Sequence, residues 1–175
     1  TKEFIKKNGE FTVNIALIEN NKPIFGIIHV PLKKETFWGS KTEGSFYMKG
    51  NNQKTKLSVE KRNRSQVRIV ASRSHPSKMI DTLLEKIGEY KIITKGSSLK
   101  FCLIAKGEAD IYPRLGPTSE WDIAAGHAIV KFAGGTLLTI DREPIQYNLT
   151  ENNLNPYFVV ASREDIALNA ISLIT

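Results

Sequence analysis

The opening part of the chain alternates short apolar runs with turn-forming residues. Residues 11–18 alternate apolar and polar side chains in their first half and then run apolar, which is typical of a β-strand. Residues 20–23, Asn-Asn-Lys-Pro, are typical of a turn, and Pro31 closes the apolar run that comes next. The predicted strands are 11–18, 24–30, 36–39 and 44–48. We therefore expect an antiparallel meander over the first ~50 residues.

From Arg68 onward the pattern changes to strands that alternate with helices. Short apolar runs predict strands at 68–72, 92–94, 109–113, 136–140 and 157–161. Apolar residues at helical spacing predict helices at 76–87, 97–106, 121–132 and 163–174. This alternation favours an α/β fold of mixed α+β character, in which a mostly parallel or mixed sheet carries helices on its faces.

Composition describes an ordinary globular domain. The 175 residues are 41% hydrophobic and 25% charged, which excludes disordered, collagen-like and coiled-coil chains. No apolar run approaches the ~18–20 residues of a membrane-spanning helix, and no signal pattern for export opens the chain. A single cysteine, Cys102, excludes an internal disulfide framework and a cysteine-built zinc site. The chain opens on Thr1 without Met, so we expect a segment of a longer protein; a mature protein processed at Thr1 is the alternative.

Positive charge is concentrated in the first part of the chain. Residues 1–100 carry a net charge of +11, whereas residues 101–175 carry −4. Between Lys49 and Lys78 nine basic residues face one acid, Glu60. A field of this sign attracts the phosphates of nucleotides, nucleic acid or a membrane surface, and a solvated lysine-rich hairpin rim explains the stretch equally well. Aromatic residues do not interleave with the basic stretch 49–78, as a base-stacking nucleic-acid platform would require.

The segment 120–128 contains the strongest candidate chemistry. Asp122 falls in the first turn of a predicted helix, where the helix dipole stabilises a carboxylate and a hard cation such as Mg²⁺ could bind. A helix cap is the commoner role for such an aspartate. Small residues at 124–126 would let this helix pack close to a neighbouring backbone. His127, on the apolar face, is expected to be packed and hydrogen-bonded rather than to bind a ligand.

Three loops offer candidate anion contacts. Gly96, Ser97 and Ser98 come after a predicted strand and open a helix, and Lys100 adds a positive charge one turn later. Ser is also a common N-cap, so this signal alone is weak. The polar loop 72–75 comes after another strand, where α/β proteins often bind ligands, but it could simply cap the next helix. Arg114 is a further anion donor or an ordinary surface arginine.

Together these motifs resemble the inositol monophosphatase superfamily. Residues 121–128, Trp-Asp-Ile-Ala-Ala-Gly-His-Ala, with Ala-Gly-Gly at 133–135, are similar to its second signature. Residues 96–102 and 112–118 resemble the bacterial 3′(2′),5′-bisphosphate nucleotidases of the CysQ type within that superfamily. The opening Thr-Lys-Glu-Phe resembles the residues directly after Asp-Pro-Leu-Asp-Gly in the first signature. The resemblance spans nearly the whole chain and implies a layered α-β sandwich of the sugar-phosphatase kind.

The resemblance also implies an activity. It implies a Mg²⁺-dependent phosphoric monoester hydrolase of sulfur metabolism that removes the 3′-phosphate of adenosine 3′,5′-bisphosphate to give AMP. Asp122 would be a metal ligand, and Thr1 would orient the attacking water beside the transferred phosphate. Both would then be catalytic and touch the substrate. The remaining substrate contacts implied are Ser72, His75, Gly96, Ser97, Ser98, Lys100 and, by a weaker match, Arg114.

The resemblance further implies which residues lie outside this sequence. The acidic residues of the first signature would precede Thr1, so residues 1–66 would be a truncated sheet portion of an N-terminal catalytic half and residues 67–175 a C-terminal α/β half. The isolated chain is therefore expected to bind Mg²⁺ weakly and to have little or no phosphatase activity. We expect a cytoplasmic location, with peripheral contact of the basic face with the inner membrane left open, and no nucleic-acid partner.

Two other functions remain open on the sequence alone. A phosphatase for inositol monophosphate or another sugar phosphate would share the same fold. A non-catalytic module that binds phosphate or nucleic acid would fit the basic first part. The sequence leaves the oligomeric state open.

Overall fold

In the computed structural model, residues 9–62, 65–71 and 78–175 are described. The first sheet is antiparallel throughout and follows chain order, with η1, a 3₁₀ turn at Pro31–Lys33, between its second and third strands. Its strands are β1 (Val13–Glu19), β2 (Lys22–Val30), β3 (Glu35–Ser40), β4 (Gly44–Lys49) and β5 (Thr55–Lys56). Asn20 and Asn21 both have positive φ, the conformation that a tight turn between β1 and β2 requires. The expected meander is confirmed, and β5 is a short addition.

The second sheet is mixed, as the alternating pattern predicts. Its strands are β6 (Val67–Ala71), β7 (Tyr90–Thr94), β8 (Ile111–Arg114), β9 (Thr136–Thr139) and β10 (Phe158–Ala161), in the order β7-β6-β8-β10-β9. β6 pairs in parallel with β7 and β8, whereas β10 pairs antiparallel with both β8 and β9.

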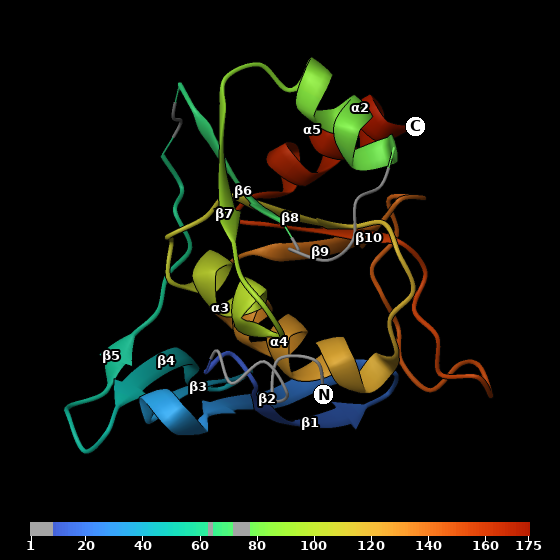
Figure 1. The fold of residues 1–175 in the computed structure, drawn as a ribbon. Coiled ribbons are helices and arrows are strands. Elements are labelled where there is room, and N and C mark those ends of the chain that lie inside the picture. Colours follow the sequence, from blue (N-terminus) through green and yellow to red (C-terminus); the bar gives the residue numbers. More distant parts are fainter. Residues whose placement is uncertain (1–8, 63–64, 72–77) are drawn as a thin grey trace.

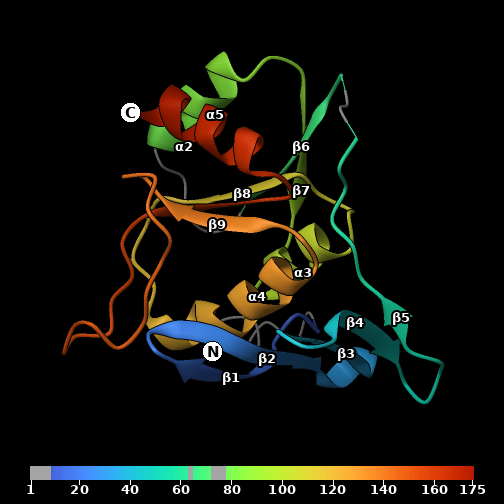
Figure 2. The same ribbon diagram turned by 180° about the vertical axis from the view of Figure 1, so that it is seen from behind.

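Helices separate and cover the two sheets. They are α2 (Lys78–Lys86), α3 (Leu99–Ala105), α4 (Glu120–Phe132) and α5 (Glu164–Ile174). Figures 1 and 2 show α3 and α4 between the sheets, and α2 with α5 on the far face of the second sheet. The expected layered α-β sandwich is therefore confirmed. No helix within the described ranges is long and apolar enough to cross a membrane.

A row of small residues across the first sheet lets α4 approach its backbone. The register aligns Ala16 with Gly26, Gly26 with Gly39, and Gly39 with Ser45. A Cβ on Gly26 would lie 2.5 Å from the carbonyl oxygen of Ala125 on α4. Ser45 Oγ donates a hydrogen bond of 2.7 Å to the carbonyl of Ile129, also on α4. The small residues at 124–126 therefore have the close-packing role that the sequence predicts.

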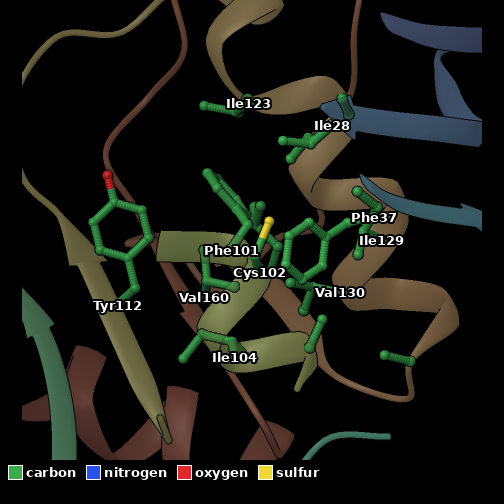
Figure 3. Close-up of a cluster of buried hydrophobic side chains, with 14 of the residues drawn as sticks. Ile28, Phe37, Phe101, Cys102, Ile104, Tyr112, Ile123, Ile129, Val130 and Val160 are labelled. Carbon is green, nitrogen blue, oxygen red and sulfur yellow. The ribbon is translucent and has the colours of Figure 1, made fainter. Parts of the chain in front are cut away.

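The main core lies in the helical layer. Figure 3 shows apolar side chains from the first sheet, α3, α4 and the second sheet meeting there. The rings of Phe101, Tyr112 and Phe158 contact one another with centroids 5.5–6.3 Å apart. This core takes residues from both sides of position 66, so the two expected halves pack as one hydrophobic unit; the boundary itself stays a prediction.

The outer face of the first sheet is apolar and open to solvent along β1. Val13, Ile15 and Leu17 project from it and are 51–61% exposed. Phe25 and Ile27 of β2 pair with Leu17 and Ile15, so the apolar surface continues across the sheet. β1 is also an edge strand among the described residues, which leaves one side of its backbone without a strand partner there.

Candidate functional site

Asp122 lies in the first turn of α4 and forms a capping box with Ser119. The backbone N–H of Ser119 donates to Asp122 Oδ2 over 3.0 Å. The side chain is exposed, and within the described ranges its other oxygen, Oδ1, has no hydrogen bond. The capping role, which the sequence favours for an isolated aspartate at this position, is therefore present. A free carboxylate oxygen at a helix N-terminus is also able to bind a hard cation.

The described residues fit a metal only in part. They contain no group of three or more His, Cys, Asp or Glu side chains that could hold a metal ion. The neighbouring carboxylate of Glu120 is engaged elsewhere, because it accepts the N–H of Asn148 at 2.9 and 3.1 Å. Asp122 can thus supply one ligand to a cation; water, substrate oxygens or residues beyond the described ranges would have to supply the others.

The serines predicted to contact the substrate are linked to the start of the first sheet. Thr12 Oγ1 is 2.6 Å from Ser97 Oγ and 2.7 Å from Ser98 Oγ, and Ser98 Oγ donates 2.8 Å to Asn14 Oδ1. Ser97 has a φ of +51°, so the backbone turns sharply before α3. Sequence reasoning missed Thr12 and Asn14. A signal for Asn14 was available: it is polar, whereas the next residues on the same inward face of β1, Ala16 and Ile18, are apolar.

The backbone N–H of Gly96 already has a carboxylate partner. Glu10, buried to 6% exposure, accepts this N–H at 2.7 Å through Oε2, and its Oε1 is 3.6 Å from Lys95 Nζ. A phosphate that bound Gly96 would have to compete with Glu10 for the same donor. The predicted contact of Gly96 with substrate stays a prediction, and Glu10 is a further residue that the sequence did not reveal.

Lys100 is buried at the start of α3 rather than extended into solvent. Its ammonium donates to the carbonyl of Ser97 over 2.6 Å and lies 5.4 Å from the centroid of the Tyr112 ring. These contacts hold the positive charge next to the Ser97-Ser98 turn. α3 begins at Leu99, later than expected, so Lys100 lies at the second residue of the helix and not one turn into it; its contact with a phosphate stays a prediction.

Arg114 on β8 and Asp122 on α4 both lie near the buried ring of Tyr112. Burial raises the pKa of Tyr112 strongly; the positive charge of Arg114 opposes this rise and the negative charge of Asp122 adds to it. Arg114 Nη2 donates to the carbonyl of Pro117 at 2.9 Å. Its Nε is buried and has no hydrogen-bond partner in the part of the chain that the structure describes. This unpaired donor fits a role in binding an anion or a water molecule.

Three predicted site residues, Thr1, Ser72 and His75, lie outside the described residues. Among the other candidates, Lys100 contacts Ser97, and Lys100, Arg114 and Asp122 each lie near Tyr112. A cavity of about 250 Å³ adjoins this region, lined among others by Asn14, Trp121 and Tyr147. Trp121 is 65% exposed, so the conspicuous tryptophan beside Asp122 presents its ring to solvent instead of the core.

His127 is packed and hydrogen-bonded, as expected. Its Nδ1 lies 2.8 Å from the hydroxyl of Tyr147, and both side chains are buried. Burial lowers the pKa of His127 to about 3, helped by the positive charge of Lys131. The imidazole is consequently neutral at physiological pH.

The chain resembles known proteins along most of its length. A nucleotidase of Salmonella typhimurium named 3′(2′),5′-bisphosphate nucleotidase CysQ is 44% identical over 160 residues, which cover 91% of this chain and 63% of that protein. The protein of the same name from Buchnera aphidicola is 48% identical over 153 residues, covering 86% of this chain and 56% of its own length. The chain thus spans less than two thirds of these relatives.

The structural comparison agrees with the sequence comparison. The crystal structure of CysQ from Bacteroides thetaiotaomicron superposes with a TM-score of 0.83 at 41% identity, covering 93% of this chain and 66% of that one. An inositol monophosphatase from Zymomonas mobilis shares the fold with a TM-score of 0.78 at 22% identity. The sequence profile of the inositol monophosphatase family matches residues 1–171. This chain belongs to the inositol monophosphatase family.

Proposed function

We propose that a protein of the relatives' length that contains this chain is a Mg²⁺-dependent phosphatase, which removes the 3′-phosphate of adenosine 3′,5′-bisphosphate to give AMP. The observation that carries the proposal is the 43–48% identity to proteins named 3′(2′),5′-bisphosphate nucleotidase CysQ. Identity to solved inositol monophosphatases is 20–22%, which supports the shared fold alone. A small phosphate-bearing substrate agrees with the family and with the donors around α3 and α4.

Asp122 would hold Mg²⁺ through the carboxylate oxygen that the capping box leaves open. When bound, the metal would lower the pKa of a water molecule and neutralise charge on the phosphate. The capping box orients the Asp122 side chain, because Oδ2 is fixed by the N–H of Ser119. The first turn of α4 adds backbone N–H groups and the positive end of the helix dipole, both of which favour an anion nearby.

The basic and hydroxyl groups would recognise the nucleotide. Lys100 has its ammonium fixed by the Ser97 carbonyl, so it offers a positioned positive charge to a phosphate. Arg114 would use its buried Nε in the same way. Ser97 would offer a hydroxyl from the turn that Thr12 braces, and Ser98 would have to exchange its hydrogen bond to Asn14 Oδ1 for one to the phosphate. The remaining proposed contacts are Thr1, which would orient the attacking water, Ser72, His75 and Gly96.

The net charge of +11 over residues 1–100 supports the same substrate class. A multiply charged nucleotide would be attracted to this part of the molecule before it reaches the site, an effect that added salt weakens. A cytoplasmic location and peripheral contact with a membrane remain predictions, as does the absence of a nucleic-acid partner.

The test compares phosphate release from adenosine 3′,5′-bisphosphate and from inositol monophosphate by the longer protein, with Mg²⁺ varied. We expect the protein to prefer the nucleotide. We expect Asp122→Asn to lower both the affinity for Mg²⁺ and the rate of phosphate release. Asp81→Asn, an exposed acid on α2, is the matched control and should change neither. Preference for inositol monophosphate would overturn the substrate assignment, and an unchanged Asp122→Asn would overturn the metal assignment.

The chain by itself should show little activity. Its described residues offer one carboxylate where two metal ions would need several. Assay of the 175-residue chain with Mg²⁺ tests this directly, and full phosphate release would contradict it.

A further inference from the structure

A second cavity, of about 360 Å³, lies toward the far end of α4 from Asp122. Lys22 at the start of β2, His127 and Lys131 on α4, and residues of β9 line it. Because an α-helix rises ~1.5 Å per residue, Lys131 lies about 13 Å from Asp122 along the axis of α4. A hydrogen bond joins His127, which lines this cavity, to Tyr147, which lines the cavity near Asp122.

The cavity carries an excess of positive charge. Within the described ranges, neither Lys22 nor Lys131 forms an ion pair or a side-chain hydrogen bond, and the same holds for nearby Lys41. Burial lowers the pKa of Lys131, and the charges of Lys22 and Lys41 lower it further, so these ammonium groups lie close enough to repel one another. Glu164 is the one acidic residue in the lining, which leaves the excess positive.

His127 adds a neutral donor to this lining. The Tyr147 hydroxyl is buried, and His127 Nδ1 is its hydrogen-bond partner among the described residues. A buried phenol needs an acceptor for its proton, so Tyr147 donates to Nδ1. The neutral imidazole then carries its own proton on Nε2. This Nε2–H has no hydrogen-bond partner in the described part of the chain, although His127 is only 6% exposed.

We propose that this cavity is a second anion site, which binds inorganic phosphate or a small phosphate monoester away from Asp122. Lys22 and Lys131 contact the phosphate oxygens, and His127 Nε2–H donates to one of them. Glu164 accepts a hydrogen bond from a hydroxyl of the phosphate or of the esterified alcohol. The volume suffices for a small molecule, and Leu137 and Ile145 provide an apolar wall for its uncharged part.

The test is a titration of the ¹⁵N-labelled chain with inorganic phosphate, followed by NMR at constant ionic strength maintained with sodium chloride. We expect saturable shifts of the backbone amides of Gly135, Thr136 and Leu137, which line the cavity. Lys22→Met combined with Lys131→Met should weaken this binding by at least about tenfold, because two charge-assisted contacts are lost. The control combines Lys78→Met with Lys91→Met, which removes the same charge at exposed positions elsewhere.

Each other outcome overturns the proposal. Shifts confined to the region of Gly96 and Asp122 would assign the phosphate to the proposed active site alone. An equal loss of affinity in the control would indicate a general charge effect, and the absence of saturable binding would indicate no site. If the double variant fails to fold, Lys22→Met alone, at the exposed first residue of β2, must still weaken binding severalfold.

Discussion

The carboxylate of Glu10 lies 2.7 Å from the backbone nitrogen of Gly96, and this hydrogen bond joins the approach to β1 with the turn that precedes α3. Lys95 balances the buried charge at 3.6 Å. The contact fixes the position of Ser97 and Ser98 relative to the first sheet, together with the Thr12 hydroxyl. The candidate site therefore depends on a residue that does not itself need to touch the substrate.

Replacing Glu10 should loosen this turn. We expect Glu10→Ala to lower the free energy of unfolding by about 1–3 kcal/mol, because the buried N–H of Gly96 and the charge of Lys95 lose their partner. Glu10→Gln keeps an oxygen acceptor and should cost less than Glu10→Ala. Urea unfolding of the three proteins provides the measurement. Equal stability of Glu10→Ala and the parent chain would contradict the role assigned to this bond.

His127 should make the chain less stable in acid. Its pKa falls from 6.5 to about 3 on folding, so the unfolded chain binds the proton more readily. The free energy of unfolding is unaffected by this group above pH ~6.5. As the pH falls from there toward 3, protonation of His127 in the unfolded chain lowers the free energy of unfolding by about 1.4 kcal/mol per pH unit. The free energy of unfolding between pH 7.5 and pH 5 measures the slope.

Two variants separate this effect from acid unfolding in general. His127→Gln removes the titrating group and should flatten the dependence over this range, although its stability at pH 7.5 should be lower. His29→Gln changes a histidine on β2 that bonds Thr36, and it is the matched control for the loss of a histidine–hydroxyl hydrogen bond. An unaltered slope in His127→Gln would show that other groups cause the acid sensitivity.

The close approach of α4 to the first sheet predicts a low tolerance for added volume. A Cβ on Gly26 would meet the backbone of α4 at 2.5 Å, so Gly26→Ala should destabilise the chain by roughly 1–3 kcal/mol and shift α4. Gly116→Ala is the control, because nothing lies within 4 Å of its added Cβ. Thermal unfolding of both variants tests the contrast. Similar losses in the two would mean that α4 is free to move away.

The open apolar face along β1 predicts self-association of the chain at high concentration. Exposed apolar patches and unpaired strand edges both promote contacts between molecules. Ile15→Lys, at a position that is 61% exposed, should reduce the associated fraction measured by sedimentation velocity. Leu149→Lys introduces the same charge at a 62% exposed loop position and should have a smaller effect. A larger effect of Leu149→Lys would place the contact surface at that loop.

Local pattern was sufficient for most of the fold. Alternation predicted the strands of the meander, and helical spacing predicted α4 within one residue of its observed start at Glu120. The small residues at 124–126 predicted a close contact, but not that its partners would be Gly26 and Gly39 of the first sheet. Strand register and packing decide such partners, and neither is encoded within a short window of sequence.

The candidate site was predicted less completely for the same reason. The Ser97-Ser98 turn and Lys100 were recognisable from their place between a strand and a helix. Thr12 bonds Ser97 across 85 residues of sequence, and Glu10 bonds Gly96 across 86. Local propensity carries no information on such pairs. From the sequence, Asp122 could be either a helix cap or a metal ligand. In the structure its Oδ2 caps the helix, and its Oδ1 is left for a metal ion.

The sandwiched position of α4 also has a consequence for synthesis on the ribosome. The four long strands of the first sheet end at Lys49, but the helix that covers their inner face begins only at Glu120. The ribosome adds about 5–20 residues per second, so the inner face of the meander stays uncovered for on the order of several seconds. During this interval it is open to chaperones and to non-native pairing, so slower translation between Lys49 and Glu120 should lower the yield of folded chain.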